Sequence, residues 1–465
     1  MASAQPKRVE DDGTVRRYVA VSDPRFHDFV HGLRYVDLPA DVAHQARRCL
    51  LDLVGVWAGG RTTELSRIIH DHAARMFGVG QGAGARLAFD GRRVSAAGAA
   101  MAGGMTIDSI DAHDGHRLTK GHAGVAVLPA ILGFADDGRP IDGEGLLAAL
   151  VVGYELAVRA GIALHASVPD YHTSGAWSAV ACAALGARLM GLDRERTRHA
   201  IGIAEYHGPR SQMMRCIDYP TMLKDGSGWG AMAGVSAAYL AADGFTGAPA
   251  VTVEEPALAN LWSDLGSRWR IMELYFKTYP VCRWAQPAVE AALSVGRGHG
   301  LTPADIDRIE VVTFHEGTRL ANRWPGSTEE AQYSLPFPVA AALAHGRVGA
   351  AEVTGVGLTD PTVLALADAI TLAESADYNA RFPAERWAHV AVTTKDGRRL
   401  VSAPATARGD PEAPLSDREV ADKFDAYAAP VVGARRARVV AEAIMGAGGV
   451  GSAALMDLIA PAPNP

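Results

Sequence analysis

The chain has 465 residues, of which 48% are hydrophobic and 21% charged, and its formal net charge is -7. This length and composition are typical of a globular protein with a large core and room for two domains. The net negative charge argues against general binding to nucleic acid or to a membrane surface, since both need a basic face. An anionic ligand would therefore have to be held by local arginine, lysine and histidine side chains.

Cysteine usage and the N-terminal sequence bear on where the protein works. The cysteines are widely separated, and none forms a C-x-x-C pair: Cys49, Cys182, Cys216 and Cys282. Isolated thiols are typical of a reducing compartment. No secretion signal is recognisable at the N-terminus, and the longest apolar stretch, 146–158, is too short to span a bilayer. We expect a cytoplasmic protein without a membrane segment.

The first half of the chain predicts helices. After an N-terminal arm that reaches about residue 20, apolar side chains recur at three-to-four spacing over residues 41–57. Further helical patterns, rich in alanine and glycine, follow at residues 96–105, 143–165, 176–190, 194–205 and 228–242. No long stretch before about residue 242 alternates with a period of two. We therefore expect this half to be all helical.

The second half mixes strands with helices. Residues 306–314 alternate and are rich in β-branched side chains, and residues 389–401 predict a β-hairpin around an Asp-Gly turn. Helical patterns occur at 287–296 and 338–344. A capping box at Ser416–Glu419 opens another helix, and residues 434–445 predict the last one before an unstructured tail at 460–465.

These patterns predict a mainly α protein. A large all-helical domain would comprise residues 21–276 and would be completed by residues 407–459. A smaller α+β domain, residues 277–406, would be inserted between these two parts.

A cluster of ionisable side chains lies between residues 108 and 122 and runs directly into the apolar segment 123–132. Its members are Asp108, Asp111, His113, Asp114, His116, Lys120 and His122. Titratable groups at the boundary of a core have shifted pKa values and are candidates for catalysis; the alternative is a solvated loop. Four of them, Asp108, His113, His116 and His122, could also bind a metal, but the specific His-Glu-x-x-His pattern is missing, and we expect no metal site.

Other candidate residues lie at helix ends and at the predicted domain junction. His172 precedes a helix whose N-terminal amides could face a carboxylate, or the segment simply caps that helix. Arg210 could clamp a carboxylate or pair with Glu205. Lys224 lies in a glycine-rich turn and could stabilise an enediolate, or it is solvated. Clefts at domain junctions often bind small molecules, and here the junction carries Tyr279, Arg283 and Gln286.

The order of several short segments between residues 42 and 427 is more specific than any one of them. They are the aspartate-rich segment that runs into His122-Ala-Gly-Val-Ala-Val-Leu-Pro, His172-Thr-Ser-Gly, the Lys224 loop followed by Gly-Phe-Thr-Gly at 244–247, Tyr279-Pro280-x-Cys282, Tyr333-Ser-Leu-Pro and Asp422-Lys-Phe. Together they resemble the MmgE/PrpD family. That family includes 2-methylcitrate dehydratases, cis-aconitate decarboxylases and an iminodisuccinate epimerase.

This resemblance implies a large helical domain with a smaller α+β lid domain, a homodimer, and metal- and cofactor-independent action on small polycarboxylates. Asp111, His122 and Lys224 match the family's active-site Asp, His and Lys. The sequence departs from the family pattern in three places. Gly115 or His116 stands where a threonine is frequent, Gln286 stands where a second catalytic histidine is usual, and the Lys224 loop lacks its usual histidine.

We therefore expect a cofactor-independent lyase of the dehydratase type that removes a proton next to a carboxylate of a small di- or tricarboxylic acid. His122 or Asp111 would be the base, Lys224 and Arg210 would hold carboxylates, and His116 or His172 would protonate the leaving hydroxyl. The remaining candidates, Asp114, Tyr279, Arg283 and Gln286, would contribute to substrate binding. With Gln286 in place of a histidine, isomerisation, epimerisation or decarboxylation is the first alternative. A non-catalytic carboxylate-binding protein and a metal hydrolase are the others.

Overall fold

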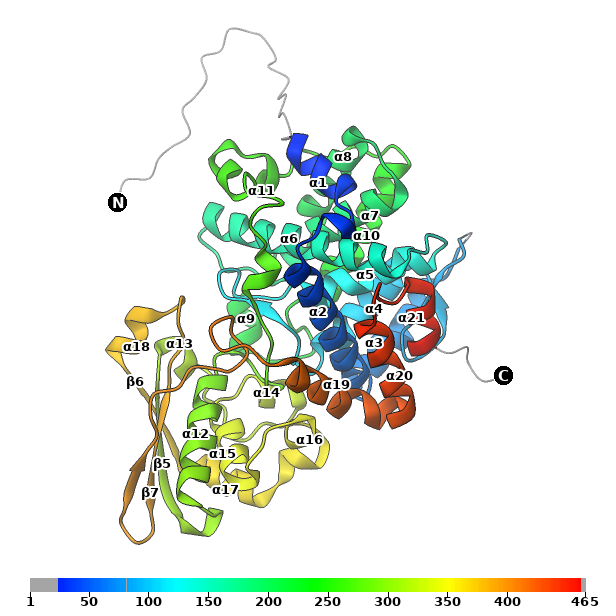
Figure 1. The fold of residues 1–465 in the computed structure, drawn as a ribbon. Coiled ribbons are helices and arrows are strands. Elements are labelled where there is room, and N and C mark those ends of the chain that lie inside the picture. The colour runs from blue at the N-terminus through cyan, green and yellow to red at the C-terminus, as the bar shows by residue number, and fades with distance from the viewer. Residues whose placement is uncertain (1–23, 81, 461–465) are drawn as a thin grey trace.

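The computed structural model describes residues 24–80 and 82–460, so the predicted N-terminal arm and all but the first residue of the predicted tail lie outside the described residues. Figure 1 shows a helical body, formed by both ends of the described chain, above a smaller part that contains the main sheet. Helices dominate the described residues, so the prediction of a mainly α protein is confirmed.

The N-terminal part of the helical body is a run of packed helices. They are α1 (Pro24–Gly32), α2 (Ala40–Gly60), α3 (Glu64–Met76), α4 (Ala96–Asp108), α5 (Gly124–Asp136), α6 (Gly143–Ser167), α7 (Gly175–Met190), α8 (Arg194–His207), α9 (Met213–Asp218), α10 (Ser227–Ala242) and α11 (Val251–Glu254). Glycine allows the close approach of α4 and α10, because a Cβ atom added at Gly104 would lie 2.7 Å from the Cα atom of Gly228.

The C-terminal helices return to this body, as expected. They are α19 (Asp417–Val432), α20 (Ala434–Met445) and α21 (Ser452–Ile459). Helix α19 packs against α2, and α20 contacts both α19 and α2. The predicted capping box is present: the Ser416 side chain accepts a hydrogen bond from the Glu419 amide, and the Glu419 side chain accepts one from the Ser416 amide.

Helix α6 is long and apolar enough to cross a membrane by length and composition. However, 94% of its most apolar window is buried inside the protein, where it packs on α7 and α5. The helix thus serves as a central element of the hydrophobic core in this fold.

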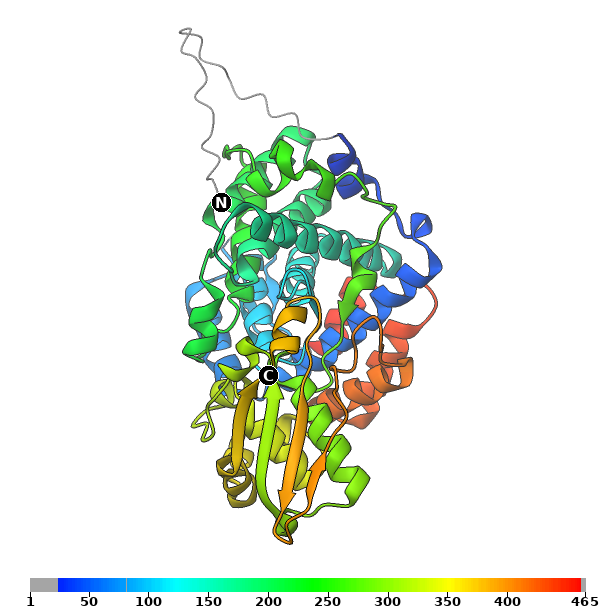
Figure 2. The same cartoon turned by 90° about the vertical axis from the view of Figure 1, so that its left-hand side faces the viewer.

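The smaller part contains a four-stranded sheet in the order β6-β5-β7-β8. Its strands are β5 (Ile306–Thr313), β6 (Ile370–Glu374), β7 (His389–Thr394) and β8 (Arg399–Val401), and β5 is parallel to β6 and antiparallel to β7. The predicted strand and hairpin are thus both present. Burial along β5 is greatest at every second or third residue, because one face of the sheet packs on helices (Figure 2).

Helices α12 (Gln286–His299), α15 (Pro336–His345) and α17 (Pro361–Asp368) cover that face (Figure 1). The shorter elements of this part are α13 (His315–Thr318), α14 (Thr328–Gln332), α16 (Ala350–Val353) and α18 (Ala376–Arg381). A separate cluster of buried apolar residues fills this part, and it also takes in Met213, Cys216 and Ile217 from α9. The boundaries expected at 276/277 and 406/407, and the role of this part as a lid, stay predictions.

The expectation of an all-helical first half was wrong in detail. Strand β1 (Ala85–Arg86) pairs with β2 (Arg93–Val94), and β3 (Gly115–His116) pairs with β4 (Leu274–Tyr275). Strands of two residues are too short to leave an alternating pattern in the sequence. The β3–β4 pair matters for function, because it ties the ionisable cluster of residues 108–122 to the segment that leads into the smaller part.

Candidate active site

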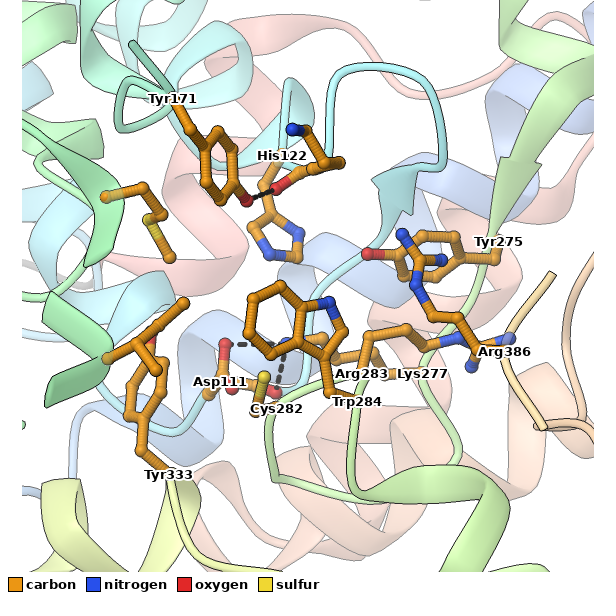
Figure 3. A pocket seen from close by; sticks show the side chains of 13 residues that line it. Asp111, His122, Tyr171, Tyr275, Lys277, Cys282, Arg283, Trp284, Tyr333 and Arg386 are labelled. Carbon is orange, nitrogen blue, oxygen red and sulfur yellow. Dashed lines mark hydrogen bonds and ion pairs between the residues drawn. The ribbon is translucent and has the colours of Figure 1, made fainter. Parts of the chain in front are cut away.

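A small cavity lies where the ionisable cluster meets the segment after β4. Its walls combine Asp111, Lys120 and His122 from the helical body with Lys277 from the connecting segment and Arg386 from the smaller part. Figure 3 shows the side chains of Asp111, His122 and Arg386 around Trp284. Charged side chains that meet in one enclosed space are the expected setting for acid–base chemistry.

His122 points into this cavity (Figure 3) and is 8% exposed. Its Nδ1–H donates a hydrogen bond to the backbone carbonyl of Asp114, which leaves Nε2 as the nitrogen able to accept a proton. Burial, with the nearby Lys277 ammonium, lowers the pKa of His122 to about 3. The imidazole is therefore neutral at physiological pH and ready to act as a base.

Ser174 holds the backbone of His122. Its hydroxyl accepts a hydrogen bond from the His122 amide at 2.8 Å and donates one to the Asp225 carboxyl group. It makes no capping bond to α7, so the simple capping role considered for this segment does not apply to the Ser174 side chain. Asp225 also accepts from the Ser174 amide at 3.0 Å. The segment thus fixes the loop that carries His122.

Asp111 and Lys277 form a buried ion pair across the cavity floor. The Lys277 Nζ atom lies 2.6 Å from Asp111 Oδ1 and 3.0 Å from the Asp111 carbonyl oxygen. Burial alone would raise the pKa of Asp111, but the ammonium groups of Lys277 and Lys224 outweigh it and lower that pKa. Asp111 is therefore ionised and offsets part of the positive charge beside His122.

The backbone is strained at three residues of this region. Asp111, Lys120 and Lys224 have φ values of 49°, 50° and 50°. These values lie in the left-handed backbone region, which residues other than glycine and asparagine seldom adopt. Such strain persists where the surrounding structure enforces it, and it clusters at functional sites. The strain points to these three side chains as groups whose placement matters.

Lys224 is fully buried beside the cavity. Its Nζ donates a hydrogen bond to the side-chain oxygen of Gln332 and lies 4.9 Å from the ring centre of Tyr333, which lines the cavity. Burial opposes its charge, but Asp111 and Asp108 raise the pKa of Lys224, so it is cationic. Lys224 thus acts on the charge of Asp111 and is not itself part of the wall of this cavity.

Asp111, His113 and His122 are the described residues whose ligand atoms come close enough to hold a metal ion, within 4.8 Å of one another. Both ring nitrogens of His113 are buried without a hydrogen-bond partner in the described part of the chain. The Asp111 carboxylate, however, is already paired with Lys277. The two neighbouring lysines make this donor set a poor match for a divalent cation.

Several predicted residues lie outside the cavity wall. His116 is buried and bonded to Glu273 at 3.1 Å, and it faces a separate surface pocket with Arg117. Asp114 is fully buried, where it accepts a hydrogen bond from Tyr154, and burial raises its pKa to about 7. Asp114 contributes to the site through its backbone carbonyl, which orients His122.

His172 and Arg210 are also not brought into the cavity. The backbone of His172 forms a β-bridge with Gln212, and its side chain is largely buried outside the cavity lining. Arg210 is exposed on the loop after α8, and the Glu205 carboxylate considered as its partner instead accepts hydrogen bonds from Val251 and Thr252. The structure therefore gives neither residue a place next to His122.

Of the three candidate residues in the junction segment, Arg283 lines the cavity, whereas Gln286 and Tyr279 lie behind its wall. Arg283 lines the cavity and pairs with Asp410 at 2.8 Å. Gln286 is fully buried: its side-chain amide donates to the carbonyls of Tyr279 and Val281, and its oxygen accepts from Arg283 at 3.0 Å. Gln286 is thus a positioning residue for Arg283, and the Tyr279 side chain is not part of the wall.

Lys277, Arg386 and Tyr275 line the cavity but were not among the predicted site residues. Lys277 stands three residues before Pro280, in the junction segment where the sequence predicts a small-molecule cleft. Arg386 lies in an unremarkable stretch between α18 and β7, more than 260 positions after Lys120 in the chain. Only the fold could bring it here.

Comparison with known proteins identifies related chains. The model of the MmgE/PrpD N-terminal domain matches residues 24–265, and that of the MmgE/PrpD C-terminal domain matches residues 279–445. The cis-aconitate decarboxylase of Homo sapiens is 25% identical, over 88% of this chain and 88% of its own length.

Two fungal proteins are similarly related. The cis-aconitate decarboxylase-like protein oryM of Aspergillus oryzae is 23% identical, over 90% of this chain and 92% of its own length. The cis-aconitate decarboxylase of Aspergillus terreus is 23% identical, over 88% of this chain and 90% of its own length. Both family domains are matched in order and together span most of the chain, which therefore belongs to the MmgE/PrpD family.

Proposed function

We propose that the protein is a lyase that moves a proton at the carbon next to a carboxylate of a small di- or tricarboxylic acid. The observation that carries this proposal is the neutral His122 imidazole, whose Nδ1–H is bound to a carbonyl and whose Nε2 is free to exchange a proton in the cavity. A positioned base of this kind contributes about 10²–10⁴-fold to the rate.

The charges around His122 suit an anionic substrate. A substrate carboxylate beside Lys277 would offset the positive charge that depresses the His122 pKa. That pKa would then rise toward its ordinary value, so the imidazole could both accept and return a proton near neutral pH. The Lys277 ammonium would also stabilise the enediolate that forms when the proton leaves carbon.

Decarboxylation is the version of this chemistry that the observations favour. His122 is the only histidine in the cavity lining among the described residues, whereas the histidines expected to protonate a leaving hydroxyl, His116 and His172, are not in it. Decarboxylation has no hydroxide to protonate. Substrate binding first raises the pKa of His122, so that its Nε2 takes up a proton from water. The bond to the leaving carboxylate then breaks, CO₂ departs, and the electron pair left on the carbon chain takes that proton from Nε2, which returns His122 to its neutral form. The related proteins named as cis-aconitate decarboxylases support this choice.

Proton NMR in D₂O tests the proposal. The protein is incubated with citrate, 2-methylcitrate, cis- and trans-aconitate, malate and iminodisuccinate. We expect deuterium at a carbon next to a carboxylate of one compound or its product, and the product signals separate decarboxylation, dehydration and epimerisation.

Lys277→Met should abolish this exchange, whereas the matched variant Lys395→Met, in the exposed turn between β7 and β8, should leave it unchanged. Shifted ligand lines without deuterium incorporation would contradict the proposal and indicate a carboxylate-binding protein. Exchange that persists in Lys277→Met would remove Lys277 from the mechanism.

A further inference from the structure

Arg386 is a buried guanidinium that forms no salt bridge with any carboxylate of the described residues. It lines the cavity from the segment between α18 and β7 (Figure 3), and only 7% of it is exposed. Its Nε atom is buried with no hydrogen-bond partner, and no salt bridge joins it to an acidic residue in the described part of the chain. An unpaired charge held out of water is unfavourable, so its retention calls for a ligand that pairs with it.

Lys120 is a second cation on the same cavity. Its Nζ atom lies 4.1 Å from the ring centre of Tyr171, and no salt bridge to an acidic residue is formed within residues 24–80 and 82–460. Burial is the main cause of a lowered pKa at Lys120, the Arg386 charge lowers that pKa further, and Glu316 offsets this only in part. Its backbone is held in the left-handed region, with a φ of 50°.

Two of the neighbouring carboxylates are already paired with other cations. Asp410 lies 2.8 Å from Arg283, and Asp111 lies 2.6 Å from Lys277. Two cations in a space of low dielectric repel each other, and a carboxylate placed between them would replace this repulsion with two favourable interactions. The free guanidinium also offers the two parallel N–H donors that match a carboxylate.

We propose that Lys120 and Arg386 form a binding subsite for a second carboxylate of the substrate, apart from the carboxylate that Lys277 holds beside His122. This inference rests on the proposed function and deepens it, because it names the residues that would distinguish di- and tricarboxylic acids from monocarboxylic acids. The subsite is made by two parts of the fold, since Lys120 belongs to the helical body and Arg386 to the smaller part. It is complete only when both are in place.

Calorimetric binding of an unreactive tricarboxylate tests the subsite. Tricarballylate is titrated into the wild type, Arg386→Met, Arg386→Lys and Lys120→Gly, with butyrate as a monocarboxylate for comparison. We expect Arg386→Met and Lys120→Gly to raise the Kd of tricarballylate by about 30-fold or more, as for loss of one partner of a buried charge pair. Arg386→Lys should retain most of the affinity, and the Kd of butyrate should change by less than about threefold.

The controls separate binding from folding. Glycine adopts the left-handed backbone at position 120 without strain, so Lys120→Gly should fold as wild type does. Arg418→Met removes an arginine whose side chain is 89% exposed, and it should change neither affinity.

The inference is overturned if tricarballylate fails to bind the wild type, or if Arg386→Met and Lys120→Gly both bind it with a Kd within about threefold of wild type. Equal weakening of butyrate and tricarballylate would also overturn it, because the loss would then not concern a second carboxylate. Arg386-dependent binding without any deuterium exchange in D₂O would support the subsite while contradicting the proposed lyase activity.

Discussion

At the scale of single residues, the site depends on how burial sets charge. His122 is neutral because it is buried beside an ammonium group, whereas Asp111 stays ionised because that same ammonium, Lys277, pairs with it. The Lys277 ammonium thus lowers the pKa of both groups, and loss of the proton leaves His122 neutral but Asp111 negative. A neutral imidazole can therefore accept a proton in an otherwise charged cavity.

The protonation of His122 can be followed directly by NMR of protein labelled with ¹⁵N in histidine. We expect its ring signals to remain those of the neutral form down to about pH 5 in the free protein, and its titration to move to higher pH with tricarballylate, whose charge offsets Lys277. His122→Gln assigns the signals. A free-protein midpoint near about 6.5, the ordinary value for histidine, would contradict the proposed electrostatics.

At the scale of elements, small residues bring the helices of the body close enough to position the site. Helix α7 begins directly after Ser174, the residue that holds His122, and α10 begins shortly after the turn that carries Lys224. The start of α7 lies against α10. A Cβ atom added at Gly230 in α10 would lie 2.4 Å from the carbonyl oxygen of Gly175. Because backbone atoms cannot yield as a flexible side chain can, this contact requires glycine.

Gly230→Ala should therefore destabilise the protein by about 1–3 kcal/mol, as expected for overpacking. Its matched control is Gly298→Ala in α12, where an added Cβ meets nothing within 4 Å. That control should be neutral or stabilise the fold by about 0.5–1 kcal/mol, because alanine favours the helix. Urea unfolding followed by circular dichroism measures both, and equal effects at the two positions would contradict the packing argument.

At the scale of the whole molecule, the cavity is a product of assembly. The ionisable cluster comes from the helical body, Lys277 from the segment after β4, and Arg386 from the smaller part with its sheet. The β3–β4 pair and the Lys277–Asp111 ion pair both join the body to this connecting segment. Contacts that hold the fold together are therefore the same ones that shape the site.

Removal of one partner of this ion pair should destabilise the whole molecule. Lys277→Met leaves the Asp111 carboxylate, which is 3% exposed, without its nearest countercharge. A buried charge that loses its partner costs about 3–5 kcal/mol, measured as a lower free energy of unfolding in urea at pH 7.

Asp111→Asn combined with Lys277→Met should recover part of this stability, because it removes the unpaired charge of Asp111. It should not recover activity, because the reaction still lacks the Lys277 ammonium. If the two groups did not interact, the double variant would lose the sum of the unfolding free energies lost by the two single variants. That result would contradict the prediction.

The sequence by itself determined the mainly α character, the return of the C-terminal helices, the strand and hairpin of the smaller part, and the cluster that contains Asp111 and His122. These features follow from local periodicity, turn residues and caps, all of which lie within a few positions of one another. Only the tertiary structure placed His116 with Glu273, gave Gln286 its role behind Arg283, and brought Arg386 near Lys120. Those placements depend on contacts between residues far apart in the chain, and no local pattern encodes which buried charges will share a cavity.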